Sequence, residues 1–176
     1  MIIFGLGNPG PKYRSTRHNA GYILLEQIAR RHRKRFSSKK DYQTCVVDIQ
    51  GTDLMLIKPK CWMNQCGHAI HDILEERKCA FLVAVDDINL PLGRMRLRKG
   101  GSDGGHLGLR SIAFALNTEN FPRLRIGIGQ PQMDAAEYVL NRFSTAERKT
   151  LAKVLNEAIQ GIHIMLRDGF TRAQDH

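Results

Sequence analysis

Short apolar runs bounded by glycine, proline or acidic residues mark the strands that the sequence predicts. Three nearly continuous apolar stretches have the length and composition of strands covered on both faces: residues 1–5, 81–85 and 124–128. Residues 44–49 and 54–58 carry β-branched side chains on either side of a turn that contains Gly51, which indicates a hairpin. A shorter β-rich stretch covers residues 94–98. Together these runs predict a sheet with buried central strands.

Segments with apolar residues at helical spacing alternate with the strands. They cover residues 22–29, 64–77, 106–116 and 144–168. The last has the clearest boundaries, because Ser144 and Glu147 form a capping box and Gly169 follows the apolar stripe. That stripe comprises Leu151, Val154, Leu155, Ala158, Ile162, Met165 and Leu166. The alternation predicts an α/β fold with a mixed, mostly parallel central sheet flanked by helices on both faces, and residues 1–176 are expected to form a single domain.

The charge of the chain changes this picture by suggesting a partner. The formal net charge is +10 and the pI is about 9.8, which favours attraction to polyanions such as nucleic acid. The densest basic run is residues 30–35 at the end of the first predicted helix. Two interpretations of the charge stay open, nucleic-acid binding and simple solubility.

The cysteines and the first residues exclude some classes of protein. The four cysteines form no C-x-x-C pair, so reduced thiols are expected and a zinc site is not. The apolar start is too short for a signal sequence or a membrane helix. We therefore expect a cytoplasmic location without membrane contact.

A glycine loop follows the first strand and suggests an alternative function. Gly5, Gly7 and Gly10 match the G-x-G-x-x-G pattern of dinucleotide-binding enzymes, which would make the protein a nicotinamide-dependent oxidoreductase. That pattern needs a helix to open within the loop, but Pro9 and Pro11 delay any regular helix. The acidic ribose-binding residue expected about 20 positions further on is missing too. The oxidoreductase is therefore the less favoured reading.

Several motifs in fixed order carry a resemblance over nearly the whole chain. They are GLGNPG at 5–10, TRHNAG at 16–21, KP at 58–59, MN at 63–64, DD at 86–87, LPLG at 90–93, GGSDGGH at 100–106 and FPRLRIGIG at 121–129. In these motifs the chain closely resembles bacterial peptidyl-tRNA hydrolases. The resemblance implies a monomeric enzyme without metal or cofactor that hydrolyses the ester between a peptide and tRNA, so that the tRNA is recycled.

The resemblance also implies roles for three polar residues. An aminoacyl ester is already activated, so a base that deprotonates water and a group that stabilises the oxyanion suffice. His18 matches the general base of the family, and the neutral pKa of histidine suits that role. Asp86 matches the acid that orients this histidine. Asn64 matches the amide proposed to hold the water or the oxyanion, and a role as N-cap of the following helix stays open beside it.

Further positions are expected to bind the substrate. The resemblance places Asn8, Tyr13, Met63, His106 and Leu107 at the peptide and the tRNA end. For Tyr13, stacking on the terminal adenine and plain packing are equally open. Arg98 and Arg125 correspond to the two basic side chains with which the family grips the tRNA 5′ phosphate, and arginine can contact phosphate through two donors.

Position 107 departs from the family pattern, which has asparagine where this chain has leucine. Leucine can neither donate nor accept a hydrogen bond, so an amide that contacts the substrate near the catalytic water is lost. This departure supports an alternative function, a tRNA- or RNA-binding homologue with weak or no hydrolytic activity. The hydrolase is favoured, because a protein that only binds RNA has no evident use for His18 and Asp86.

Overall fold

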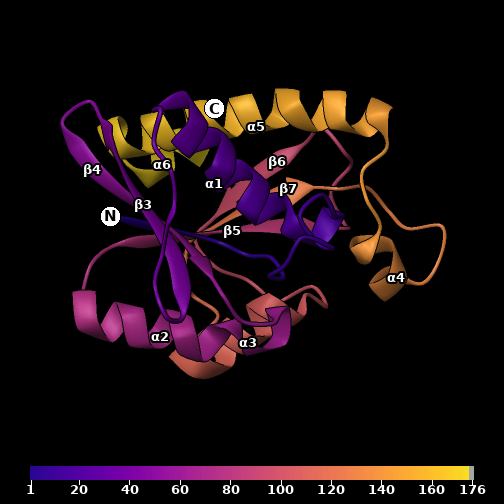
Figure 1. Cartoon of the computed structure of the whole chain (residues 1–176), viewed down its shortest axis with the longest axis horizontal. Coiled ribbons are helices and arrows are strands. Elements are labelled where there is room, and N and C mark those ends of the chain that lie inside the picture. Colours follow the sequence, from indigo (N-terminus) through magenta and orange to yellow (C-terminus); the bar gives the residue numbers. More distant parts are fainter. Residues whose placement is uncertain (175–176) are drawn as a thin grey trace.

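The computed structural model describes residues 1–174, and its centre is one seven-stranded sheet with the order β2-β3-β4-β1-β5-β7-β6 (Figure 1). The strands are β1 (Ile2–Gly5), β2 (Ser37–Ser38), β3 (Tyr42–Ile49), β4 (Thr52–Pro59), β5 (Phe81–Asp87), β6 (Met95–Arg98) and β7 (Arg123–Gly127). The four central strands β4, β1, β5 and β7 run parallel. Antiparallel pairs lie at both edges of the sheet. At one edge β3 pairs with β4 and β2 pairs with β3, and at the other edge β6 pairs with β7.

Helices cover both faces of this sheet. They are α1 (Ala20–Arg31), α2 (Cys66–Arg77), α3 (Leu107–Leu116), α4 (Ala135–Leu140), α5 (Thr145–Asp168) and α6 (Phe170–Gln174), together with the 3-10 turns η1 (Arg17–Asn19) and η2 (Met63–Gln65). Figure 1 shows α1 and α5 on one face and α2 and α3 on the other. The predicted α/β fold with a mixed sheet between helices is confirmed. Within residues 1–174, no helix combines the length and the apolar character needed to cross a membrane.

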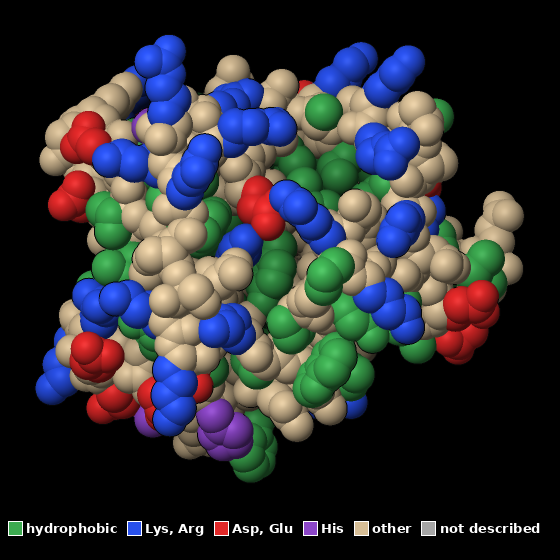
Figure 2. Space-filling model, in the orientation of Figure 1, with side chains coloured by type: hydrophobic (Ala, Val, Ile, Leu, Met, Phe, Trp, Pro, Cys, Tyr) green, Lys and Arg blue, Asp and Glu red, His purple; other side chains and the backbone are tan. Residues whose placement is uncertain are grey.

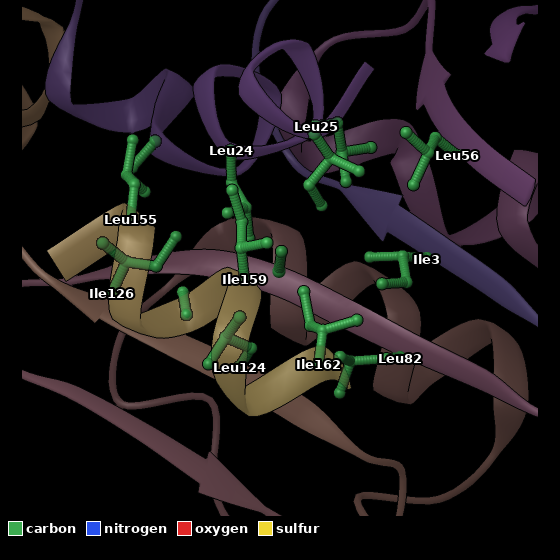
Figure 3. Packing of buried hydrophobic residues seen from close by; sticks show 14 of the residues in the cluster. Ile3, Leu24, Leu25, Leu56, Leu82, Leu124, Ile126, Leu155, Ile159 and Ile162 are labelled. Carbon is green, nitrogen blue, oxygen red and sulfur yellow. The ribbon is translucent and has the colours of Figure 1, made fainter. Parts of the chain in front are cut away.

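The alternation of side chains along the strands divides the core between the two faces. Ile3 and Leu82 point toward α1 and α5, whereas their neighbours Phe4 and Val83 belong to the cluster under α2 and α3. Figure 3 shows the first cluster, in which leucines of α1 and the apolar stripe of α5 meet the sheet. Because both faces are covered, β1 is buried throughout, as its continuous apolar sequence predicts.

The ends of α5 follow the sequence signals. The Ser144 side chain accepts from the Glu147 N–H, and the Glu147 carboxylate accepts from the Ser144 N–H, so the predicted capping box is confirmed. Gly169 ends the helix with φ of 88°. Every residue of the predicted stripe is buried except Leu166, which is half-buried.

The start of α1 lies directly against the sheet, and Gly21 makes this possible. A Cβ at Gly21 would overlap the Ala84 carbonyl oxygen of β5 and the Leu6 amide nitrogen. The backbones therefore approach more closely than any other residue would allow. Since Asp86 lies two residues beyond Ala84, this contact brings the turn before α1 to the carboxyl end of β5.

The helix predicted from residue 64 begins differently. A 3-10 turn, η2, precedes α2, and the residue at the cap position of α2 is Gln65. The N-cap role considered for Asn64 is therefore wrong. The short helices α4 and α6 were not predicted from the sequence, because six and five residues are too few to show helical periodicity.

Candidate active site

A cavity of about 630 Å³ opens at the carboxyl ends of the parallel strands, the usual place for a site in an open α/β sheet. The predicted site residues in its lining are Asn8, His18, Met63, Asn64, Asp86, His106, Leu107 and Arg125. Tyr13 and Arg98 are not part of this lining. Residues that are up to 117 positions apart in the sequence, from Asn8 to Arg125, therefore meet in one hollow.

His18 and Asp86 form the polar centre of the cavity. The Nδ1 atom of His18 lies 3.1 and 3.0 Å from the two carboxylate oxygens of Asp86. With Nδ1–H donated to the carboxylate, Nε2 is the unprotonated nitrogen and is free to accept a proton. Burial lowers the pKa of His18, but the charge of Asp86 and the hydrogen bond to it outweigh burial and raise the pKa overall. Burial acts on Asp86 in the opposite direction, yet His18 and His106 hold its pKa well below the usual range.

His106 completes this centre from the other side. Its Nδ1 accepts the backbone N–H groups of Gly108 and Leu109, at 3.1 and 3.2 Å, and so caps α3. Nε2 therefore carries the proton and donates it to Asp86 Oδ1 at 3.0 Å. His106 lines the cavity, but both of its ring nitrogens are engaged within the protein. Its polar contacts thus position Asp86 and leave no ring nitrogen for a substrate.

The same three side chains lie close enough to suggest a metal site. One ligand atom from each of His18, Asp86 and His106 lies within 4.8 Å of the others. The donor set does not suit a metal, however, because His106 would have to ligate through Nε2. That nitrogen carries a proton as long as Nδ1 accepts from the two amides of α3. The arrangement suits a hydrogen-bonded base and its orienting acid.

The glycine loop after β1 is held by two asparagines. Asn19 accepts the Asn8 N–H through Oδ1 at 2.8 Å and donates through Nδ2 to the Asn8 carbonyl at 3.0 Å. The Asn8 side-chain oxygen accepts the Met63 N–H at 2.9 Å. Because its oxygen is occupied in this way, the Asn8 amide nitrogen is the group available to the cavity. The sequence predicts no role for Asn19, although this residue lies in the motif that contains His18.

The turn that carries His18 is fixed to the opposite side of the cavity by Arg17. Its guanidinium pairs with Glu147 at 2.7 Å, donates to the Arg142 carbonyl at 3.1 Å and lies 4.3 Å from the ring centre of Tyr138. Arg17 is buried, with 8% of its surface exposed. The buried arginine ties η1 to α4 and α5, a role that the sequence does not reveal because it depends on contacts more than 120 positions away.

Comparison with known proteins identifies the family. A model of the peptidyl-tRNA hydrolase family matches residues 2–176. The chain belongs to the peptidyl-tRNA hydrolase family. The resemblance read from the sequence is thus confirmed.

Individual relatives agree over nearly their full length. The peptidyl-tRNA hydrolase of Thermodesulfovibrio yellowstonii is 36% identical over 181 residues, which cover 99% of this chain and 97% of the relative. That of Carboxydothermus hydrogenoformans is 41% identical, with coverage of 98% and 95%. The crystal structure of peptidyl-tRNA hydrolase from Acinetobacter baumannii has a TM-score of 0.90 at 32% identity and matches 99% of this chain and 92% of that one. This chain therefore shares the fold of that member of the peptidyl-tRNA hydrolase family.

One wall of the cavity in this peptidyl-tRNA hydrolase family member is apolar. Leu107, the first residue of α3, is 50% exposed, and Trp62 and Leu140 on the same lining are 49% and 44% exposed. Figure 2 shows hydrophobic side chains (green) gathered between the positions of α3 and α4. Large apolar side chains exposed together in a hollow mark a place where an apolar group binds. Leu107 thus adds to an apolar wall at the position where the resemblance expects an amide.

Tyr13 contacts this wall through Trp62. Its ring meets Trp62 edge to face, with the ring centres 5.7 Å apart. This contact agrees with the packing interpretation of Tyr13, and Trp62 is the aromatic residue in the cavity lining. No pattern in the sequence singles out Trp62, because the exposure of one aromatic residue cannot be read from the sequence.

Arg98 and Arg125 lie on neighbouring strands, on the face of the sheet that carries Val83 and Val85. Arg125 pairs through Nε with Asp87 at 2.6 Å and lines the cavity. Arg98 is exposed and lies diagonally from it, since the residue directly opposite Arg125 is Arg96. The two predicted phosphate ligands therefore share a surface, with one at the cavity and one beyond it.

Proposed function

We propose that the protein hydrolyses the ester bond of peptidyl-tRNA, with His18 as the general base. The observation that carries this proposal is the orientation of His18, whose Nδ1 is held by the buried Asp86 while the ring lines the cavity. A histidine that deprotonates water needs one ring nitrogen held in place and the other open to the substrate. The peptidyl-tRNA hydrolases to which the chain is similar act, by their names, on this substrate.

In the proposed reaction, water attacks the ester carbonyl while His18 Nε2 takes its proton. The new C–O bond gives a tetrahedral oxyanion, and the imidazolium is stabilised by the Asp86 carboxylate. Collapse breaks the bond to the ribose oxygen, which recovers the proton from His18. The products are a peptide with a free carboxyl group and a tRNA with a free terminal hydroxyl. No covalent intermediate or metal takes part.

Two amides are suited to orient the reacting groups. Asn64 lies exposed on η2 in the cavity lining. Its proposed role is to hold the attacking water or the developing oxyanion. Asn8 offers its Nδ2 donor beside Met63, where it would hold a carbonyl of the peptide. The loss of one such oxyanion donor costs about 3 kcal/mol in other enzymes.

The rest of the cavity would divide between peptide and tRNA. The apolar wall with Leu107 and Trp62 suits the acyl part of the substrate, and Met63 forms its buried floor. Arg98 and Arg125 would contact the 5′ phosphate, and the ion pair with Asp87 would hold the Arg125 guanidinium in place. This division also predicts that one copy of the chain suffices, because all groups named in the reaction come from a single chain.

A single-turnover assay with a short peptidyl-tRNA tests the proposal. Wild-type protein is expected to release free peptide, and His18→Ala is expected to reduce the rate by at least a thousandfold. Far-ultraviolet circular dichroism of the variant controls for folding. Full activity of His18→Ala would remove this residue from the mechanism, and Lys149→Ala on the exposed side of α5 provides a control that should keep the wild-type rate.

A second function, RNA binding without turnover, is favoured by one observation, the apolar Leu107 in the cavity. It predicts that wild-type protein binds peptidyl-tRNA tightly and releases no peptide, and that Leu107→Asn restores release. Release of peptide by the wild-type protein would exclude it.

A further inference from the structure

A second hollow, of about 670 Å³, lies beside the C-terminal half of α1. Its cationic lining residues are Arg14, Arg30, Arg33, Lys34, Arg35 and Lys58. They include most of the basic run at the end of α1, for which the active site has no use. Figure 2 shows Lys and Arg side chains (blue) gathered over the upper part of this face, around the C-terminal half of α1 in Figure 1.

The backbone folds the basic run together instead of extending it. Arg33 adopts a left-handed conformation with φ of 54°, and its N–H bonds to the Arg30 carbonyl at 3.1 Å. The next amide, of Lys34, bonds to the Ala29 carbonyl at 2.9 Å. The chain thus turns back over the end of α1, which places consecutive cationic residues around one hollow.

The charge in this hollow is poorly compensated. Its one carboxylate among the described lining residues is Glu26, which already pairs with Lys58 at 2.8 Å. Within residues 1–174, the arginines at positions 14, 30, 33 and 35 form no ion pair with an acidic side chain. Cationic side chains this close together repel one another, so a bound polyanion would relieve the repulsion.

The shape and chemistry of the hollow favour RNA over a membrane. Arginine side chains around a concavity suit the projecting phosphates of a nucleic-acid backbone, which they contact through two donors each. A membrane-binding surface instead presents exposed apolar residues beside its cations. Here the apolar lining residues Ile23 and Phe36 are only half-exposed, and Lys58 covers the Phe36 ring at 4.2 Å.

We propose that this hollow binds the ribose-phosphate backbone of the RNA substrate at a distance from the reacting ester. The inference rests on the proposed function. The helix α1 begins two residues after His18 and has 12 residues, so it spans about 18 Å between the catalytic turn and the basic run. RNA whose 3′ end reaches His18 could therefore follow α1 and place phosphates several nucleotides away in the hollow. The site is separate from Arg98 and Arg125, which lie on the opposite face of the sheet.

The test compares a full-length peptidyl-tRNA with an N-acetyl-aminoacyl-adenosine, which is too short to reach the hollow from His18. In the double variant Arg30→Gln/Arg35→Gln, KM for the full-length substrate is expected to rise about tenfold with kcat within twofold, whereas kinetics with the short substrate stay unchanged. For the same variant, the slope of log Kd against log salt for uncharged tRNA should become shallower by about 1.5, since two phosphate contacts are lost.

The double variant Lys149→Gln/Lys153→Gln serves as a matched control, because it removes the same charge from the exposed side of α5. An equal rise of KM in this control would show that the effect comes from net charge alone and would overturn the proposed binding site. Unchanged KM for the full-length substrate in the hollow variant would overturn it too. The same holds if the hollow variant loses binding to anionic lipid vesicles but keeps its binding to tRNA. If wild-type protein hydrolyses neither substrate, the proposed function fails, and the tRNA-binding measurement still tests the hollow.

Discussion

His106 donates a hydrogen bond to Asp86 at 3.0 Å with one ring nitrogen and caps α3 with the other. Asp86 is thereby fixed between two imidazoles, of which only His18 has a nitrogen left for chemistry. The centres of the two rings are 4.8 Å apart, and both imidazoles hydrogen-bond to the same carboxylate. His106 is thus a positioning residue for the proposed base.

The two roles of His106 can be separated by substitution. His106→Asn should still cap α3, because asparagine is a good N-cap, but its shorter side chain cannot reach Asp86. We expect unchanged stability and a kcat lowered about tenfold. His106→Ala should lose both functions and cost about 1 kcal/mol of stability in addition. Urea unfolding and steady-state kinetics of both variants measure the difference, and wild-type kcat in His106→Asn would rule out the positioning role.

The activity should depend on pH through His18. Its pKa is raised above the ordinary value of 6.5, because Asp86 outweighs the lowering by burial. The base must be neutral to accept a proton, so kcat/KM is expected to rise with pH and to level off only above that value. Asp86→Asn should move this acid limb to lower pH and reduce the maximal rate. A pH profile of kcat/KM for both proteins tests this.

The same ion pair should affect stability, with the opposite sign. Because folding raises the pKa of His18, its contribution to stability is fully present below about 6.5 and is lost as pH rises through the folded pKa. Wild-type protein should therefore lose more unfolding free energy across this window than His18→Gln. Equal pH dependence of the two proteins would show that His18 is not coupled to Asp86 in the folded state.

Leu107 should give the enzyme a preference for apolar acyl groups. Its half-exposed side chain lines the cavity with Trp62 and Leu140. Leu107→Asn is expected to lower the ratio of kcat/KM for N-acetyl-leucyl-tRNA to that for N-acetyl-aspartyl-tRNA about tenfold, as expected for the loss of roughly 1.4 kcal/mol of apolar contact. Phe114→Asn on the same helix is the control, because Phe114 is 80% exposed and does not line the cavity. A ratio that stays constant in Leu107→Asn would contradict the preference.

The contact between α1 and β5 should be sensitive to a single methyl group. Gly21→Ala would force the Ala84 carbonyl and the start of α1 apart, so both stability and kcat are expected to fall, the former by about 2 kcal/mol or more. Gly161→Ala in α5 is the matched control. Its Cβ would meet only the end of Met95 at 3.6 Å, so stability should rise by about 0.5–1 kcal/mol. Thermal unfolding and kinetics of both variants compare the two sites.

The sequence predicts the framework well, for identifiable reasons. Covered strands such as β1 and β5 are apolar throughout, and α5 combines a long stripe with a capping box, so these elements can be recognised locally. The predicted start of α2 was wrong, because a 3-10 turn precedes the helix, and the N–H of Met63 in that turn donates to the Asn8 side-chain oxygen. Such a contact over 55 positions leaves no local pattern.

For the site, the family resemblance supplied the residues and the structure supplied their relations. His18 and Asp86 are 68 positions apart, and nothing in their spacing predicts a hydrogen bond. Nor does the sequence indicate that both nitrogens of His106 are used internally, or that Arg125 pairs with Asp87. The buried side chains of Arg17 and Arg123 cannot be recognised from the sequence for a related reason. A buried arginine, such as Arg123 with its donors on three carbonyl groups, resembles a surface arginine in the sequence.

The single tryptophan of the chain stands half-exposed at the cavity, next to Tyr13. Indole emission responds to water and to neighbouring rings, so this protein carries its own optical reporter. Entry of any ligand beside Trp62 should alter the intrinsic fluorescence without an added dye. Occupancy of the cavity can then be followed in real time, in variants that have lost all turnover as well as in the active protein.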